Sequence, residues 1–345
     1  MKPMLIEGMT MYRLLAALTL LISVSAIAAT PFSQQPKVRQ FINEVSKEAK
    51  LNKQELIKIM DQVEIQPKII ESMERPYEKK NWDEYQRLFL TQKRLNHGIE
   101  YWQTHQDELK KAEKHYGVPS HMVVAILGIE TLYGQNQGDY RVIDALSTLA
   151  FNYPKRAPFF RKELKEYLIL CKEQGVSPLK YKGSYAGAIG MPQFMPSSYR
   201  HYAASFTSKR EKDLVSDHDT VIASVANYFK VHGWQPQQGI AQIANISKPL
   251  PKWIKTNQKK PTYTYQQLVN AGIVPKTAAF NAPKKVGIIE LETEKGKEYW
   301  LAYPNFYVIT RYNSSPQYAL AAYLLSQQLQ QKWHVSNYKH QFSWA

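Results

Sequence analysis

Apolar residues recur every three to four positions through much of the first third of the chain, and this spacing restricts that part to a helical fold. The pattern runs from Phe41 to Val63 and again from Trp82 to Tyr116. Residues three and four apart share one face of an α-helix, so we predict that both stretches are helical and pack these faces into a core. Gly117-Val118-Pro119 ends the second stretch, and Pro119 is suited to the first turn of another helix.

The character of the sequence changes after about residue 246. Prolines break the segment that follows into loops and short pieces, at Pro249, Pro251, Pro261, Pro275 and Pro283. Residues 286–292 and 298–302 flank Lys295-Gly296 in a hairpin-like pattern, and residues 306–312 are rich in strand-forming side chains. The predicted fold class is therefore mainly α, of the α+β type, with a small antiparallel β insertion before a final helix.

The N-terminal segment has the form of a secretory signal peptide. Arg13 precedes an apolar run of 16 residues, 14–29, which ends in small residues around Ala28. This run is shorter than about 20 residues, the length that a membrane-spanning helix needs. We therefore expect cleavage near Ala28 or Ala29 and a protein of the periplasm, with an uncleaved anchor as the alternative. No cysteine follows this region to carry a lipid.

Composition narrows the class of partner. The 345 residues, 44% of them hydrophobic, predict a globular chain of roughly two domains and exclude a disordered one. Lys and Arg total 45 against 29 Asp and Glu, which gives a formal net charge of +16 and favours nucleic acid, an anionic membrane face or an anionic cell-wall polymer. Export argues against nucleic acid. Cys171 is the single cysteine, so no internal disulfide and no cysteine-based zinc site can form.

The most informative predicted helix covers residues 120–134, SHMVVAILGIETLYG. Glu130 lies one helical turn from apolar side chains, and Gly128 removes bulk beside it. A poorly solvated carboxyl group favours its protonated form, which suits a general acid. A glutamate at the helix surface, or one paired with a buried arginine, is the alternative.

A glycine-rich run, GSYAGAIGMPQFMPSSY, occupies residues 183–199. Its glycines let the backbone turn sharply and approach a ligand closely. Ser184 and Gln193 offer hydrogen bonds, and Tyr185 and Phe194 offer flat faces, a combination suited to sugar rings. The run has no Gly-Lys-Ser/Thr pattern and is not a phosphate-binding loop. A plain connector between helices is the alternative.

These motifs together resemble the membrane-bound lytic murein transglycosylase B family. The resemblance covers about residues 37–330 and is carried, in order, by GIETLYG with Glu130, Asp144-Ala145-Leu146 with Phe151-Asn152-Tyr153-Pro154, the run at 183–199, SVANYF at 224–229 with HGW at 232–234, and PNFYVITRYN at 304–313. It implies a lysozyme-like core with an added helical domain and a small β domain. It also implies cleavage of the β-1,4 bond between N-acetylmuramic acid and N-acetylglucosamine in peptidoglycan, which leaves a 1,6-anhydromuramic end.

The resemblance also implies site residues. By motif, Glu130 is expected to be the sole catalytic acid and base, and Ser184, Gln193, Tyr228 and Asn313 are expected to line the glycan groove. By position only, it adds weaker candidates for the same groove: Tyr85, Lys155, Arg156, Phe194, Tyr312 and Tyr318. Core packing with a satisfied hydroxyl is the alternative for each tyrosine. The implied ligands are peptidoglycan glycan strands, with other cell-wall enzymes as candidate partners, no nucleic acid and a monomeric chain.

The domain organisation follows from these elements. A last helix is predicted to begin near Pro316. The predicted parts are a signal peptide at 1–29, an N-terminal helical region at 30–118, a lysozyme-like catalytic core at 119–246, a small β domain at 247–312, and a C-terminal helix at 313–345 that returns to the core.

The predicted chemistry has to work with one carboxyl group. Ordinary glycosidases use two, whereas this helix offers only Glu130, and Asp144 is predicted to cap the helix that follows it. We expect the substrate to complete the reaction: its 2-acetamido group stabilises the cationic centre, and the muramyl 6-hydroxyl attacks C1 while Glu130 takes its proton. Two alternatives stay open, a non-catalytic peptidoglycan-binding scaffold and a muramidase that uses Asp139 or Asp144 as its second carboxylate.

The sequence departs from the family's pattern in two places. The family's type member is a lipoprotein, and this chain lacks the cysteine. The family can also carry an acidic calcium loop after the PSSY stretch, where this chain reads FTSKREKDL at 206–214. Lys209 and Arg210 stand where oxygen ligands would be needed, so we predict that calcium is not bound and that no cofactor is required.

Overall fold

The computed structural model describes residues 30–74, 80–207, 211–277 and 283–342, with side chains as far as Val335. The predicted signal peptide lies outside these ranges. The described chain is mostly helical and has two small antiparallel sheets, so the predicted fold class is confirmed. None of its helices is long and apolar enough to cross a membrane.

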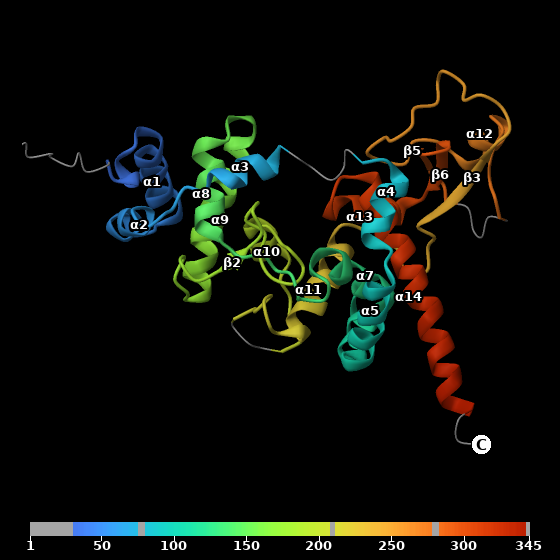
Figure 1. Ribbon diagram of the computed structural model, residues 1–345, viewed down its shortest axis with the longest axis horizontal. Helices are drawn as coiled ribbons and strands as arrows, with labels where there is room; N and C mark the ends of the chain where they lie inside the picture. Colours follow the sequence, from blue (N-terminus) through green and yellow to red (C-terminus); the bar gives the residue numbers. More distant parts are fainter. Residues whose placement is uncertain (1–29, 75–79, 208–210, 278–282, 343–345) are drawn as a thin grey trace, which may run out of the picture.

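Helices from two separate parts of the chain gather at one end of the molecule (Figure 1). They are α1 (Pro36–Ala49), α2 (Lys53–Met60), α3 (Pro67–Met73), α8 (Val142–Asn152) and α9 (Ala157–Gln174). α8 packs against both α3 and α9. The stretch predicted to be helical from Phe41 to Val63 is two helices, because Lys50 takes a left-handed φ of 52° after α1 and the Asn52 side chain caps α2.

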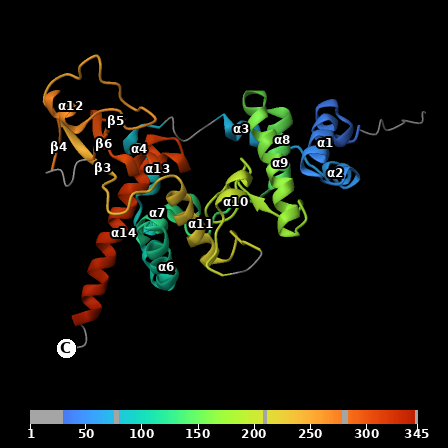
Figure 2. The same cartoon turned by 180° about the vertical axis from the view of Figure 1, so that it is seen from behind.

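A second group of helices forms the other end, as the front and back views agree (Figures 1 and 2). It contains α4 (Trp82–Phe89), α5 (Gln92–Thr104), α6 (Gln106–Tyr116), α7 (Ser120–Thr131) and the long α14 (Pro316–Phe342). The stretch predicted from Trp82 to Tyr116 is thus three helices, and the Thr91 hydroxyl caps the second by accepting from the Arg94 N–H at 3.2 Å. Gly117, with a φ of 72°, ends α6 as predicted.

Helix α7 is the centre of this group. Every residue from Met122 to Ile129 is buried, because α5, α6, α11 (His218–Val231) and α14 pack around it. A helix enclosed in this way is apolar all round rather than striped. It also ends at Thr131, earlier than predicted, because Leu132, Tyr133 and Gly134 have φ angles of 50°, 60° and 91°.

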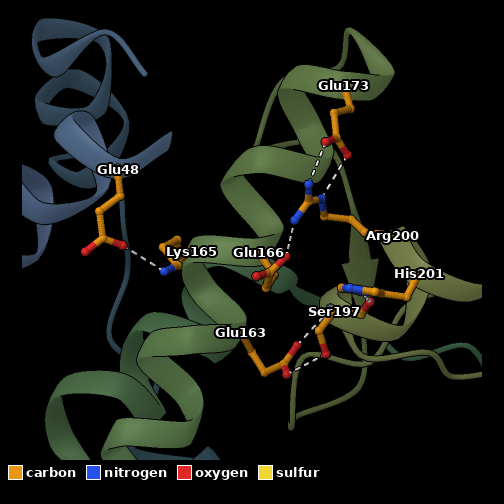
Figure 3. A network of polar contacts seen from close by, with 8 residues as sticks. All are labelled: Glu48, Glu163, Lys165, Glu166, Glu173, Ser197, Arg200 and His201. Carbon is orange, nitrogen blue, oxygen red and sulfur yellow. Dashed lines mark hydrogen bonds and ion pairs between the residues drawn. The ribbon is translucent and has the colours of Figure 1, made fainter. Parts of the chain in front are cut away.

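Helix α10 (Pro196–Tyr202), which carries the end of the glycine-rich run, is fixed to α9 by charged groups (Figure 3). The Glu163 carboxylate accepts from the Ser197 N–H at 2.9 Å and from its hydroxyl at 2.7 Å. Arg200 donates to Glu173 at 2.9 and 2.7 Å and also to Glu166. A carboxylate at the first turn of a helix is favourable, so Glu163 stabilises the start of α10.

The larger sheet contains four antiparallel strands in the order β4-β3-β6-β5. They are β3 (Ala241–Ile246), β4 (Ile273–Pro275), β5 (Gly287–Thr293) and β6 (Gly296–Ala302), and α12 (Tyr265–Asn270) lies between β3 and β4 in sequence. The predicted hairpin is confirmed, with Gly296 at a φ of 116° in its turn. Strand β3 precedes residue 247, so the sheet begins before the predicted β segment.

One strand prediction is wrong. Residues 306–312, rich in strand-forming side chains, belong to α13 (Pro304–Tyr312). Pro304 stands at the first helical position, and Phe306 and Ile309, three residues apart, are both 0% exposed. Packing against α14 therefore overrides the strand propensity of these residues.

The interpretation of Asp144 as a helix cap is also wrong. Asp144 lies inside the first turn of α8, is 3% exposed and makes no capping bond to its own helix. Its carboxylate accepts from Arg141 at 2.6 and 3.0 Å and from the Glu64 N–H at 3.0 Å. It therefore ties α8 to the connection between α2 and α3.

We predict that Asp144→Asn destabilises the protein. The change removes the negative charge from a buried pair and leaves the Arg141 guanidinium poorly compensated, which should lower the free energy of unfolding by about 2–3 kcal/mol. Urea unfolding measures this. Asp139→Asn, at an exposed position, is the control and should stay within about 0.5 kcal/mol of the parent. Equal stability of the two variants would contradict the assignment.

Candidate active site

Glu130 lies in the last turn of α7, immediately before the backbone reverses. Two hydrogen bonds to α5 stabilise the reversal. The Tyr133 hydroxyl donates to the Arg94 carbonyl at 3.0 Å, and the Arg94 Nε donates to the Gly128 carbonyl at 2.8 Å. A Cβ at Gly128 would lie 2.4 Å from the Tyr133 hydroxyl. Gly128 therefore makes room for the Tyr133 ring. The sequence had suggested that it makes room for Glu130.

The Glu130 side chain is half-buried and accepts a hydrogen bond from a tyrosine. Tyr318, in the first turn of α14 and 3% exposed, donates its hydroxyl to the Glu130 carboxylate at 2.5 Å. Burial raises the pKa of Glu130 to about 7, and the Tyr318 hydrogen bond opposes this rise without cancelling it. The carboxyl group is therefore poised to hold or release a proton near neutral pH.

The glycine-rich run packs against the end of α7. The Thr131 hydroxyl donates to the Met191 carbonyl at 2.9 Å, which places the run beside Glu130. Gly190 has a φ of 73°, and a Cβ there would lie 2.2 Å from the Leu214 carbonyl oxygen, so only glycine allows this close approach. At Gly190 the predicted sharp turn is present, and the close approach it allows is to Leu214.

Ser184 and Gln193 both help to form the run. The Ser184 hydroxyl oxygen accepts from the N–H groups of Ala186 and Ala188 at 3.3 and 3.0 Å. The Gln193 amide nitrogen donates to the Gln137 and Gly190 carbonyls at 3.1 and 2.9 Å. Within the described residues the Ser184 hydroxyl hydrogen and the Gln193 amide oxygen take part in none of these bonds, so each can still bind a ligand.

An aromatic cluster connects the run to Glu130. The Phe194 ring lies 5.5 Å from Tyr228 and 5.8 Å from Tyr312, and the Tyr312 ring is parallel to that of Tyr318 at 6.5 Å. Tyr312 donates to the Pro192 carbonyl and Tyr228 to the Arg311 carbonyl, each at 2.5 Å. These side chains therefore form one packed wall between the run, α11 and the α13–α14 turn.

Tyr85 belongs to the same region, since it contributes to the raised pKa of Tyr318. It is 2% exposed and its ring stacks on Trp82 at 6.3 Å. Phe194 is equally buried, at 2%. Both side chains are packed as core residues are. Both also lie beside the Glu130 cluster, where the resemblance places them.

Asn313 marks the edge of a polar pocket of about 630 Å³. The pocket lies between the start of α4, strand β5 and the start of α14, and its wall includes Asn81, Asn257 and Gln317. The Asn313 side-chain oxygen accepts from the Ser315 N–H at 3.0 Å. Since Asn313 directly follows Tyr312, this pocket adjoins the aromatic wall.

Two predicted residues stand elsewhere. Lys155 and Arg156 lie in the short turn between α8 and α9, at the other end of the molecule. Lys155 pairs with Glu74 at 3.4 Å, and Arg156 lies over the Phe159 and Phe160 rings. These contacts, within the described ranges, are all made away from the Glu130 cluster.

The sequence missed the residues that support the site from behind. Arg94 fixes the Gly128 carbonyl and Thr131 fixes the glycine-rich run, as described above. The Tyr133 hydroxyl bonds the Arg94 carbonyl on α5, a contact that the sequence does not indicate. No periodic pattern marks these roles, because each depends on backbone carbonyls from other helices.

Comparisons with known proteins agree with this arrangement. The pattern of the transglycosylase SLT domain matches residues 33–327. The chain belongs to this family. Membrane-bound lytic murein transglycosylase B of Escherichia coli K12 is 37% identical to it over 307 residues, which is 86% of this chain and 83% of that protein.

Solved structures give the same result. Lytic transglycosylase SltB1 of Pseudomonas aeruginosa, in a catenated form, has a TM-score of 0.81 and 41% identity, covering 87% of this chain and 99% of that chain. The E. coli lytic transglycosylase Slt35 in complex with bulgecin A has a TM-score of 0.79 and 37% identity, covering 88% and 95%. The resemblance deduced from the motifs is confirmed.

A structure of Slt35 in complex with calcium, with 36% identity and a TM-score of 0.79, covers 88% of this chain and 95% of that chain and raises the question of a metal here. The described residues hold no group of three Asp, Glu, His or Cys side chains able to bind one. The Asp213 carboxylate accepts from the Val215 and Ser216 N–H groups at 2.6 and 3.1 Å, and the Lys212 ammonium donates to the Ala203 carbonyl at 2.7 Å. These residues do not fit a calcium site; Lys209 and Arg210 lie outside the described ranges.

We predict that Glu130→Gln stabilises the protein at alkaline pH. A folded-state pKa raised from 4.5 to about 7 gives stability that is complete below pH 4.5 and is lost as pH rises through 7. The variant has no charge to bury, so its advantage should grow from near zero at pH 4 to about 3 kcal/mol at pH 8. Denaturant unfolding at both pH values measures this.

The matched control is Glu100→Gln, at an exposed position on α5. It should change the free energy of unfolding by less than about 0.5 kcal/mol at both pH values. If Glu130→Gln gained nothing between pH 4 and pH 8, the raised pKa of Glu130 would be wrong.

Proposed function

We propose that this protein is a lytic transglycosylase that cleaves the β-1,4 bond between N-acetylmuramic acid and N-acetylglucosamine in peptidoglycan and leaves 1,6-anhydromuramic ends. The observation that carries the proposal is Glu130, a carboxyl group with a pKa of about 7 beside a glycine-rich loop and an aromatic wall. The names of the relatives, as lytic transglycosylases, point to the same reaction.

One carboxyl group serves both proton transfers in this mechanism. Protonated Glu130 gives its proton to the glycosidic oxygen as the bond to C1 breaks, and the 2-acetamido group stabilises the cationic centre. The Glu130 carboxylate then removes the proton of the muramyl 6-hydroxyl, whose oxygen attacks C1. A group that acts as acid and then as base works best with a pKa near the working pH.

Tyr318 supports both steps as a positioning residue. Its hydroxyl orients the carboxyl group and stabilises the carboxylate that the first transfer leaves behind. Ser184, Gln193 and Asn313 supply neutral polar groups for the glycan, and the net charge of +16 suits an anionic polymer. Lys155 and Arg156 remain candidates for contact with a more distant part of the substrate.

The two alternatives are less well supported. A two-carboxylate muramidase needs a second acid, but Asp144 is already bound to Arg141 and Asp139 is exposed. Burial and the Tyr318 hydrogen bond are the causes that act on the pKa of Glu130, and no second carboxylate within the described residues is among them. A binding scaffold has no need of a carboxyl group held near neutrality.

The site of action that fits this reaction is the cell envelope. The sequence features at residues 1–29 and the murein-directed name of the E. coli relative support export to the periplasm.

We predict that Glu130→Gln removes activity on purified peptidoglycan while glycan binding persists. General acid–base catalysis contributes about 10²–10⁴-fold, and this group is used twice, so the loss should reach at least that range. Mass analysis of soluble products measures activity, and wild-type fragments should carry anhydro ends, one water lighter than hydrolysed fragments. Asp139→Asn is the matched control and should keep full activity.

Three results would each count against the proposal. Activity in Glu130→Gln would remove this residue from the mechanism. Reducing ends in the wild-type product would favour a two-carboxylate hydrolase. Binding without cleavage by the wild type would favour the scaffold.

We further propose that the enzyme works without calcium. In the described part of the 206–214 segment the Lys212 ammonium already binds a backbone carbonyl, and Asp213 is occupied by N–H groups. Thermal unfolding and activity should therefore be the same with millimolar calcium and with a chelator. A reproducible rise of the midpoint with calcium concentration, as binding linkage requires, would contradict this.

A further inference from the structure

A second pocket, of about 330 Å³, lies at the opposite end of α7 from Glu130. His121, in the first turn of α7, lines it, together with residues of α14 and of the connection between α11 and β3. His121 and Glu130 are nine positions apart on one helix, which places them about 13 Å apart along its axis. Binding pockets for small molecules start at about 300 Å³, so this one has room for one small ring.

The chemistry of the lining is unusual for so basic a chain. None of the described residues that line the pocket is Asp, Glu, Lys or Arg. Instead the wall carries amide side chains from two segments, Gln237, Gln238, Gln242, Gln327 and Gln330, and aromatic rings, Trp234, Tyr303 and Tyr323. Amides both donate and accept hydrogen bonds, and flat rings pack on the apolar face of a sugar.

The wall is held in a fixed shape by buried polar contacts. Asn305, which is 0% exposed, accepts from the Gln235 N–H at 2.8 Å and donates to the Gln235 and Gln238 carbonyls at 2.8 and 3.1 Å. Tyr303 donates its hydroxyl to the amide oxygen of Gln242. These contacts fix the backbone at residues 235–238 and the Gln242 side chain before binding, and this part of the wall loses little entropy when a ligand enters.

Two ring nitrogens at the pocket are buried and lack partners. Trp234 is 7% exposed, and its indole N–H has no acceptor in the described structure. The Nδ1 atom of His121 likewise has no partner there. Buried polar groups are normally paired, so these two side chains keep unused bonding capacity, which a ligand can reach once a ring turns toward the pocket.

We propose that this pocket is a second glycan-binding site that takes an uncharged N-acetylated sugar ring of the N-acetylglucosamine type. The absence of a cation among the described lining residues gives a lactyl or peptide carboxylate no partner, so the muramyl residue is disfavoured. The inference rests on the proposed function only in taking peptidoglycan as the polymer. A strand held here would stay close to the enzyme between cleavages.

The test uses hydrogen–deuterium exchange on the full chain carrying Glu130→Gln, so that no substrate is consumed, with tri-N-acetylchitotriose as the probe. We expect the sugar to slow exchange at residues 235–242 and 325–331. When Gln327→Ala and Gln330→Ala are added, the probe concentration needed for the same protection should rise about tenfold or more, because two hydrogen bonds are lost. Gln331→Ala, exposed and outside the pocket, is the matched control and should change nothing.

Activity provides the second measurement, with Glu130 restored. The Gln327→Ala/Gln330→Ala variant should release products from insoluble peptidoglycan at least fivefold more slowly, with unchanged kcat on short soluble fragments. Gln242→Ala, from the other segment, should act in the same direction. Three outcomes would each overturn the proposal. The saturating probe gives no protection at 235–242, the protection survives both glutamine changes, or an isolated muramyl peptide protects equally well. Protection at 183–195 reports the catalytic cleft separately, so its loss would bear on the proposed function instead.

Discussion

The enclosure of α7 is the constraint on which the rest of this structure depends. Four helices cover it, so the carboxyl group at its last turn is partly shielded from water, and this burial raises the pKa of Glu130 to about 7. The raised pKa is maintained because the residue is tied to a hydroxyl and not to a cation. The backbone reversal after Thr131 then turns the chain away and leaves room for the glycine-rich run.

A comparison of three carboxyl groups shows why Glu130 differs. Asp144 and Glu163 are each 3% exposed, but Asp144 is bound to Arg141 and Glu163 to the N–H and hydroxyl of Ser197. Those partners occupy the carboxylate oxygens and tie helices together, so the two groups are structural. Glu130 has a tyrosine hydroxyl, which orients the carboxyl group and still permits protonation. The chemical role follows from the partner and not from burial alone.

The sequence predicted the features that depend on local pattern. The hairpin at Gly296, the end of α6 at Gly117 and the acid in an apolar helix all follow from residues close together in the chain. It failed where tertiary packing decides. Residues 306–312 are helical because α13 packs against α14 with Phe306 and Ile309 buried, and Asp144 bonds Arg141 instead of capping its helix. The resemblance placed Tyr318 and Tyr312 in the glycan groove by position only, and the structure adds the bond from Tyr318 to Glu130. Arg94 and Tyr133 act through backbone carbonyls that no motif marks.

Helix α7 joins two kinds of surface at fixed separation. One end carries the titrating carboxyl group beside neutral polar side chains, and the other end borders the uncharged pocket lined by glutamines. Because a buried helix does not bend easily, a sugar bound at one end has a defined distance from the acid at the other. Peptidoglycan is too large to diffuse. A second contact with the same strand therefore raises the effective concentration of the next glycosidic bond at the catalytic cleft, although the cleft itself gains no contact. A rigid helix with the acid at one end and an uncharged pocket at the other therefore fits the proposal of a second glycan-binding site at a fixed distance from the cleavage site.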